Sequence, residues 1–316
     1  MKKLLSLLIL VVLAFSLTGC GGGKTATTAG GPEKEQKTVA ILTPYLSSVT
    51  TNEMVENLKT QVAKRDLKAN VVDTKGDFAQ LASRMEDLIS SKVNAIVLVS
   101  TDPNQLKDQI KKAQEKGIPV FGCDSGYIEG MTMNATSDNQ AMAQMITEYL
   151  FTTMNYKGNL VVLTHRPHPG VLKRTQELDV LLQKTTEIKI VTEQQVQVPG
   201  PIESARQQME NLLLANKTEE SLTAVWAGWD EPAIGASQAI EAAGRKNIVV
   251  VGIDGTSQAI DMIKKGSPLI ATVKQNFPGM AEIVANQIDL VFQGKQAEGT
   301  ELYAPAALIT KENAGK

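Results

Sequence analysis

Short, continuous apolar runs that alternate with helical periods constrain the fold of this chain more than any other feature. Between residues 222 and 256, the run Ala224-Val225-Trp226 precedes a helical period over 232–243, and a second apolar run covers 248–253. Strands that are apolar on both faces are typical of parallel sheets covered by helices on both sides. The segment therefore predicts a βαβ unit of an α/β fold.

The same alternation continues along the chain from residue 38. Strands are predicted at 39–42, 69–72, 95–99 and 119–122, and in a second series at 131–134, 160–163, 188–191, 225, 249–251 and 270–273. Helical periods lie at 52–65, 78–91, 105–116, 138–154, 170–184, 202–215, 232–243, 257–264 and 277–292. We therefore predict an α/β protein with two doubly wound parallel-sheet domains in tandem. Ser137-Asp138-Asn139 at the seam is a predicted helix N-cap and hinge.

The N-terminus is typical of an exported protein. Met1-Lys2-Lys3 is basic, residues 4–17 are apolar and small residues follow, which predicts a signal peptide over 1–19. The end of this segment, Leu17-Thr18-Gly19-Cys20, resembles the bacterial lipobox, and this implies that Cys20 is lipidated and becomes the mature N-terminus. Removing 1–19 takes away two lysines and changes the formal net charge from −2 to −4. Residues 20–37 are rich in Gly, Thr and Ala and predict a flexible tether.

Charge and composition argue against several classes of protein. Lys and Glu are dispersed and the charge is near neutral, so we predict no nucleic-acid partner. Only Cys123 remains after lipidation, which excludes an intrachain disulfide and is typical of a small buried residue near a strand end. His165 and His168 offer two ligands where zinc needs three or four, so no metal site is predicted. Nothing resembles a nucleophile elbow, a zinc helix or a phosphate loop, and we expect neither a cofactor nor an enzymatic activity.

Two side chains at strand ends are candidate ligand contacts. In open parallel sheets, ligands bind in the crevice outside the carboxyl ends of the strands. Trp229 follows one predicted strand and Asp254 follows the next. Trp226 lies within its strand and is the better candidate for the core. We therefore assign Trp229 to the site.

Several segments resemble one known family when they are taken in order. They are residues 118–124 (IPVFGCD), 137–139 (SDN), His168-Pro169 with Arg174, 229–231 (WDE), 252–256 (GIDGT) and 271–275 (ATVKQ). The chain from residue 37 onward resembles the periplasmic binding proteins of sugar ABC importers, in the ribose and galactose group that shares its fold with the effector domains of the lac-repressor family. The resemblance implies three crossings between the domains, near Ser137, Asn276 and Glu301. The expected lobes are 38–136 plus 276–301 and 137–275 plus 302–316.

The resemblance also implies binding roles for particular residues. Asp124 and Asp254 match acids that accept hydrogen bonds from sugar hydroxyls, and such charge-assisted bonds contribute about 1.5–3 kcal/mol each. Arg174 matches a sugar-binding arginine, and His168 matches a contact to a ring oxygen and a hydroxyl. Gln275 matches a polar contact at the hinge. The alternatives are that the acids cap helices, that Arg174 is solvated and that Gln275 caps a strand end.

Departures from the family pattern bear on the ligand. The loop after the first strand offers one aromatic ring, Tyr45, and several polar groups, among which Thr51 and Asn52 are candidate contacts together with Ser100 after the third strand. Ser125 stands where the ribose binder has an arginine, and Trp229 replaces a small polar contact. These changes favour another pentose, a deoxy sugar or a sugar alcohol over ribose or glucose.

We therefore predict an extracytoplasmic solute-binding lipoprotein, monomeric and anchored to the membrane through Cys20. It captures a neutral monosaccharide or sugar alcohol between its domains and delivers it to an ABC permease with its ATPase. A transcriptional regulator of the same fold needs a DNA-binding headpiece where this chain has a signal and tether. Presentation of a signal molecule to a membrane receptor, such as a furanone autoinducer or a nucleoside, stays open as an alternative.

Overall fold

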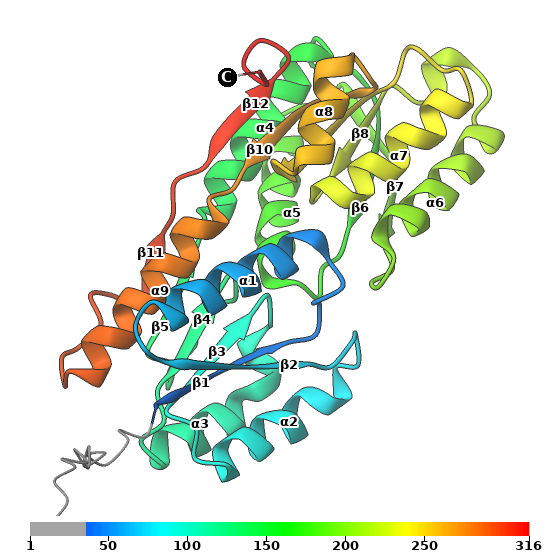
Figure 1. The fold of residues 1–316 in the computed structure, drawn as a ribbon. Coiled ribbons are helices and arrows are strands. Elements are labelled where there is room, and N and C mark those ends of the chain that lie inside the picture. Colours follow the sequence, from blue (N-terminus) through cyan, green and yellow to red (C-terminus); the bar gives the residue numbers. More distant parts are fainter. Residues whose placement is uncertain (1–35, 316) are drawn as a thin grey trace, which may run out of the picture. The chain divides into compact units, whose positions relative to one another are not determined.

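The computed structural model describes residues 36–315. The predicted signal peptide, Cys20 and the tether up to residue 35 lie outside the described residues. Within the described part of the chain, two six-stranded sheets are each covered by helices (Figure 1). No helix there is both long enough and apolar enough to cross a membrane.

The first sheet has the strand order β11-β5-β4-β3-β1-β2, and all of its pairs are parallel. Its strands are β1 (Thr38–Thr43), β2 (Lys68–Asp73), β3 (Ala95–Val99), β4 (Val120–Cys123), β5 (Met133–Thr136) and β11 (Glu301–Tyr303). The helices against it are α1 (Val49–Ala63), α2 (Ala79–Ser90), η1 (Pro103–Leu106), α3 (Lys107–Glu115) and α9 (Phe277–Phe292). We call this sheet with its helices the first lobe.

The second sheet has the order β12-β10-β9-β8-β6-β7. Its strands are β6 (Gly158–Thr164), β7 (Ile188–Gln195), β8 (Ala224–Ala227), β9 (Val249–Asp254), β10 (Leu269–Lys274) and β12 (Ala307–Thr310). Its helices are α4 (Asn139–Thr153), α5 (Pro169–Leu182), α6 (Pro201–Ala215), η2 (Glu219–Ser221), α7 (Asp230–Ala242) and α8 (Ser257–Lys265). We call this sheet with its helices the second lobe.

Alternate residues of the central strands enter different cores, which explains their continuous apolar sequences. In β1, Val39 and Ile41 pack with residues of α1 and α9, whereas Ala40 and Leu42 pack with residues of α2 and α3. In β8, Trp226 is fully buried on the face covered by α4, and its indole N–H donates to the hydroxyl of Thr147 at 3.0 Å. The predicted α/β fold with two parallel sheets is therefore confirmed, and Trp226 is a core residue.

The chain passes between the two sheets at three places. β5 belongs to the first sheet and α4 to the second lobe, β10 precedes α9 of the first lobe, and β11 precedes β12. Leu302 and Tyr303 pair with β5, so the first sheet extends two residues past the predicted boundary at 301. β12 runs antiparallel to β10 and is the only antiparallel strand in the described sheets.

Four strands differ from the sequence prediction. β11 and β12 were not predicted, because they are short and carry only a few apolar residues. β5 begins two residues later than expected, since Met131 precedes it and packs against the core beneath α2 and α3. β7 continues through polar residues to Gln195, because an edge strand exposes much of its length to solvent.

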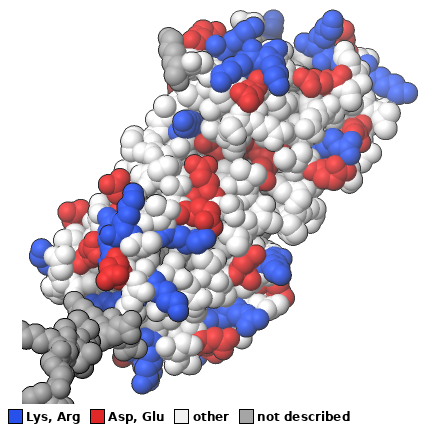
Figure 2. Space-filling model, in the orientation of Figure 1, with Lys and Arg blue, Asp and Glu red and all other residues white. Residues whose placement is uncertain are grey.

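On the face in Figure 2, charges of both signs are interspersed.

Candidate functional site

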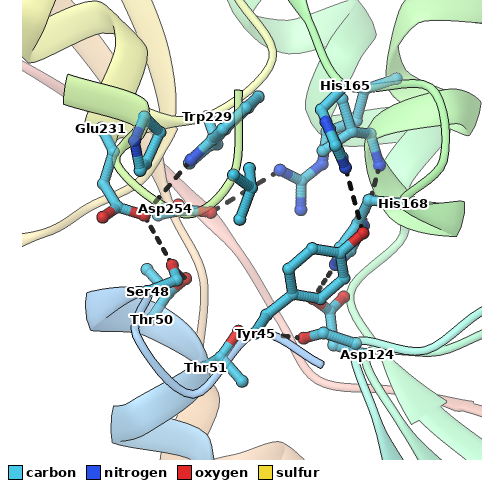
Figure 3. A pocket seen from close by; sticks show the side chains of 15 residues that line it. Tyr45, Ser48, Thr50, Thr51, Asp124, His165, His168, Trp229, Glu231 and Asp254 are labelled. Atoms are coloured by element: carbon cyan, nitrogen blue, oxygen red, sulfur yellow. Dashed lines mark hydrogen bonds and ion pairs between the residues drawn. The ribbon is translucent and has the colours of Figure 1, made fainter. Parts of the chain in front are cut away.

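A cavity lies at the carboxyl ends of strands from both sheets (Figure 3). The first lobe contributes Tyr45, Ser48, Thr50, Thr51, Ser100 and Asp124 to its lining. The second lobe contributes His165, His168, Val171, Arg174, Val198, Pro201, Trp229, Glu231 and Asp254. Residues far apart in the sequence meet there because parallel strands place their carboxyl ends at one edge of each sheet.

The structure brings most of the predicted site residues together in this lining. Those present are Tyr45, Thr51, Ser100, Asp124, His168, Arg174, Trp229 and Asp254. Asn52 is exposed and does not line the cavity. Successive residues of a helix are rotated by about 100° from one another, and the first turn of α1 directs Thr50 and Thr51 to the cavity and Asn52 to solvent. Gln275 is buried next to the cavity and donates from Nε2 to Oδ1 of Asp254 at 2.8 Å.

Asp124 directly follows β4 and is a buried acceptor. Its carboxylate accepts a hydrogen bond from the Thr136 hydroxyl at 3.3 Å, and Nε2 of His168 lies 3.7 Å from its other oxygen. Burial raises the pKa of Asp124, while the charge of Arg174 and the bond from Thr136 act in the opposite direction. No helix begins directly after Asp124, so it does not have the capping role that was the alternative.

Asp254 ends β9 in an unusual backbone conformation. Its φ is 143°, a value that residues other than glycine rarely adopt, and such strain is concentrated at functional sites. Burial raises its pKa well above the usual value, and the charges of Asp230 and Asp124 add to this, while Arg174 and Gln275 oppose it. The hydroxyl of Thr256 caps helix α8, so Asp254 is not the cap of that helix.

Arg174 is the cation of the site and is only 2% exposed. Its Nε donates to Oδ1 of Asn139 at 2.7 Å, and Nη1 donates to the carbonyl of Gly228 at 2.9 Å. Nη1 also lies 3.6 Å from Oδ1 of Asp254. Among the described residues, Nη2 has no hydrogen-bond acceptor, so this end of the guanidinium remains available to a ligand oxygen.

His168 presents a hydrogen-bond donor beside the cavity. Its Nδ1 lies 3.1 Å from the backbone nitrogen of Gly170 and 3.3 Å from that of Val171. Both backbone groups are donors, so Nδ1 is the acceptor and the proton of the neutral ring is on Nε2. Burial lowers the pKa of His168 to about 3, and the charges of Arg174 and His165 contribute to this. The ring is therefore neutral and offers Nε2–H.

His165 has the opposite tautomer and joins the lobes. Its Nδ1 lies 3.1 Å from the carbonyl oxygen of Val196, so Nδ1 is protonated. Nε2 then accepts the hydroxyl proton of Tyr45, which belongs to the first lobe, at 3.1 Å. Burial lowers the pKa of His165, although its bond to Val196 opposes this change. Tyr45 thereby keeps its oxygen lone pairs for a ligand hydroxyl.

Trp229 and Glu231 lie on the side of the site away from His168 and Asp124 in Figure 3. Trp229 is 8% exposed and lines the cavity with Val171 and Val198, which gives this side an apolar surface. The carboxylate of Glu231 accepts hydrogen bonds from the Trp229 indole at 3.3 Å and from the Ser48 hydroxyl at 2.6 Å. Burial raises the pKa of Glu231, while the bonds from Ser48 and Trp229 act in the opposite direction.

Sequence reasoning missed several residues of the lining. They are Ser48, Thr50, His165, Val171, Val198, Pro201 and Glu231. Ser48 and Thr50 lie in the same polar stretch of sequence as Thr51, and that stretch was the signal that could have identified them. Glu231 lies beside Asp230, whose carboxylate is held by the hydroxyls of Thr256 and Thr272 and is structural.

The described residues contain no group of three or more side chains suited to a metal ion.

Comparison with known proteins agrees with this fold. A family model described as a periplasmic binding protein domain matches residues 39–296. The chain is 26% identical over 305 residues to the xylitol-binding protein of Mycolicibacterium smegmatis, and this match covers 95% of this chain and 83% of that protein. It is 26% identical to the ribose import binding protein RbsB of Bacillus subtilis, over 99% of this chain and 100% of that protein.

Solved structures share the fold. An ABC sugar transporter subunit from Rhodobacter sphaeroides matches with a TM-score of 0.83 and 26% identity, over 88% of this chain and 99% of that chain. An ABC transporter solute binding protein from Agrobacterium vitis with bound allitol matches with a TM-score of 0.83 and 25% identity, over 89% of this chain and 97% of that chain. Both likenesses extend over the two lobes described above.

Proposed function

This chain belongs to the periplasmic binding protein domain family, and we propose that it captures a neutral monosaccharide or sugar alcohol between its lobes and delivers it to an ABC importer. Members of the family are substrate-binding proteins of transport systems, so the protein is expected to release its ligand unchanged. The relatives named above bind or import xylitol and ribose, and the structure from Agrobacterium vitis holds allitol.

The observation that carries the proposal is that both lobes direct buried hydrogen-bonding groups at one cavity. Asp124 comes from the first lobe, whereas Asp254 and Arg174 come from the second. Hydroxyl groups both donate and accept, so a polyhydroxylated ligand matches a lining that mixes carboxylate acceptors with guanidinium and imidazole donors. Buried groups of this kind discriminate strongly against molecules that leave them unpaired.

The site favours a small ligand with one apolar face. Trp229 with Val171 and Val198 supplies one apolar wall, and a C–H face of a sugar or polyol packs on such a surface. The only other aromatic six-membered ring in the lining is Tyr45, and its hydroxyl is bound to His165. A pair of rings that would enclose a pyranose from both sides is not formed, which favours pentoses and open-chain polyols.

Delivery is proposed to depend on closure of the lobes around the ligand. We propose that the first and the second lobe move about the three connections between the sheets, with the ligand bound by both lobes in the closed form. An ABC permease then recognises this form, and a lipid on Cys20 keeps the monomeric protein near the membrane. Both lobes supply polar groups to one cavity, and this supports the proposal.

A thermal-shift screen over pentoses, hexoses, polyols and nucleosides tests the function. A ligand at a hundred times its dissociation constant adds about 2.7 kcal/mol to the unfolding free energy. For a chain of this size that corresponds to a rise of about 5–10 °C in the melting temperature. We expect a pentose or a polyol to give the largest rise and to be recovered unchanged. A rise with nucleosides alone would replace the proposal by presentation or import of a signal molecule.

A further inference from the structure

Glu231 is a buried carboxylate that lies between the two lobes. It is 4% exposed and occupies the first turn of α7 in the second lobe. One of its oxygens, Oε2, accepts the Ser48 hydroxyl of the first lobe at 2.6 Å and the Trp229 indole of its own lobe at 3.3 Å. Figure 3 shows both bonds converging on this carboxylate. A single oxygen therefore connects the aromatic wall of the site to the opposite lobe.

The first helix of the first lobe depends on this contact at its N-terminus. Ser48 is the N-cap residue of α1, but its side chain makes no capping bond within the helix, and the first turn of α1 has no acidic residue. The Ser48 hydroxyl is directed to Glu231 instead. Glu231 thus supplies from the second lobe the negative group that helix N-termini favour.

The bond to Trp229 fixes the aromatic wall. The indole N–H is the single donor of that side chain, and Glu231 is its acceptor. The bond restricts rotation of the ring, and Trp229 lines the cavity together with Val171. The position of the ring and the contact between the lobes therefore share one carboxylate.

We propose that Glu231 is a positioning residue that couples closure of the lobes to the orientation of the Trp229 ring. In the closed form, Glu231 holds Ser48 and the N-terminus of α1 on one side and the indole on the other. When the lobes separate, the bond to Ser48 is lost and the ring keeps only the bond within its own lobe. The inference rests on the proposed function in two respects, because it takes from it that the lobes close and that Trp229 contacts the ligand.

A test that needs no ligand compares four variants of the protein. Glu231→Ala removes both bonds, Ser48→Ala removes only the bond between the lobes, and Glu231→Gln keeps an oxygen that accepts from both donors. Glu241→Ala, an exposed residue near the end of the same helix, is the control. Acrylamide quenching reports the accessibility of Trp229, with Trp229→Phe identifying its share of the signal. Small-angle X-ray scattering reports the compactness, and circular dichroism confirms folding.

We expect Glu231→Ala to lower the ratio of closed to open molecules about tenfold, which is equivalent to about 1.4 kcal/mol. Its radius of gyration and its Trp229 quenching should both increase. Ser48→Ala should mainly increase the radius, whereas Glu231→Gln and Glu241→Ala should resemble the wild type. Equal radii for the wild type and Ser48→Ala, or equal effects of Glu231→Gln and Glu231→Ala, would overturn the inference. Neither readout uses a sugar, so such a failure leaves the proposed function to be judged by the thermal-shift screen.

Discussion

Replacing Asp254 by alanine should weaken ligand binding more than any other single truncation in the cavity. The carboxylate accepts from Gln275 at 2.8 Å and lies 3.6 Å from Arg174. Alanine removes the acceptor offered to ligand hydroxyls and reduces the compensation of the Arg174 charge. It also leaves the Gln275 amide without its partner, although Oε1 of that amide already lacks one among the described residues.

The magnitude follows from the bonds that are lost. Hydrogen bonds to a charged group contribute about 1.5–3 kcal/mol each, and unpaired ligand hydroxyls in a closed site add a desolvation penalty. We expect Asp254→Ala to reduce the binding free energy by about 2–4 kcal/mol, a loss of affinity of about thirtyfold to a thousandfold. Trp229→Ala removes apolar contact but leaves no ligand hydroxyl unpaired, so its effect should be about 1–2 kcal/mol.

Isothermal titration calorimetry with the sugar or polyol identified by the thermal-shift screen measures both losses. Asp261→Ala, an exposed residue of α8 in the same lobe, is the matched control and should bind like the wild type. Circular dichroism establishes that each variant is folded. A loss for Trp229→Ala that clearly exceeds the loss for Asp254→Ala would refute the reasoning and would favour an apolar or aromatic ligand.

Three further predictions follow from the backbone, the buried histidine and the N-terminus. Glycine tolerates the φ of 143° at residue 254, so the free energy of unfolding of Asp254→Gly should exceed that of Asp254→Ala by about 1–3 kcal/mol in denaturant titrations. Equal free energies of unfolding would contradict backbone strain at this residue. The unfolded chain protonates its histidines near pH 6.5, whereas folded His168 stays neutral down to about pH 3. Because the unfolded state binds the additional proton, this group lowers the free energy of unfolding by about 1.4 kcal/mol for each unit that the pH falls between these values. Between pH 7 and pH 4.5, His168→Asn, which keeps a capping oxygen, should therefore lose less of its free energy of unfolding than the wild type does. Equal losses for the two proteins in denaturant titrations would count against a neutral His168. Cys20→Ser should appear unacylated in the soluble fraction, and its retention on membranes would exclude Cys20 as the anchor.

The fold could be predicted because its central strands are buried on both faces. In β8 and β9, apolar runs stop abruptly at Trp229 and Asp254, and such boundaries are visible in sequence. The short strands β11 and β12 could not be found in this way, because their pairing partners lie far away in the chain and their own residues are only partly buried.

The site was predictable where a residue follows a strand and less so where a contact joins the lobes. Ser48 and Glu231 are 183 residues apart, so no local pattern announces their hydrogen bond. The direction of a side chain on a helix also depends on the start of that helix, which explains why Thr51 lines the cavity and Asn52 does not. The tautomers of His165 and His168 follow only from their hydrogen-bond partners.

A crystal structure with the bound sugar or polyol would show directly whether both lobes bind one ligand. We expect one ligand in the cavity, with its hydroxyls within hydrogen-bonding distance of Asp124 from the first lobe and of Asp254 and Arg174 from the second. One C–H face of the ligand should lie on the Trp229 ring. A ligand that contacts a single lobe, or that binds outside this cavity, would contradict the account.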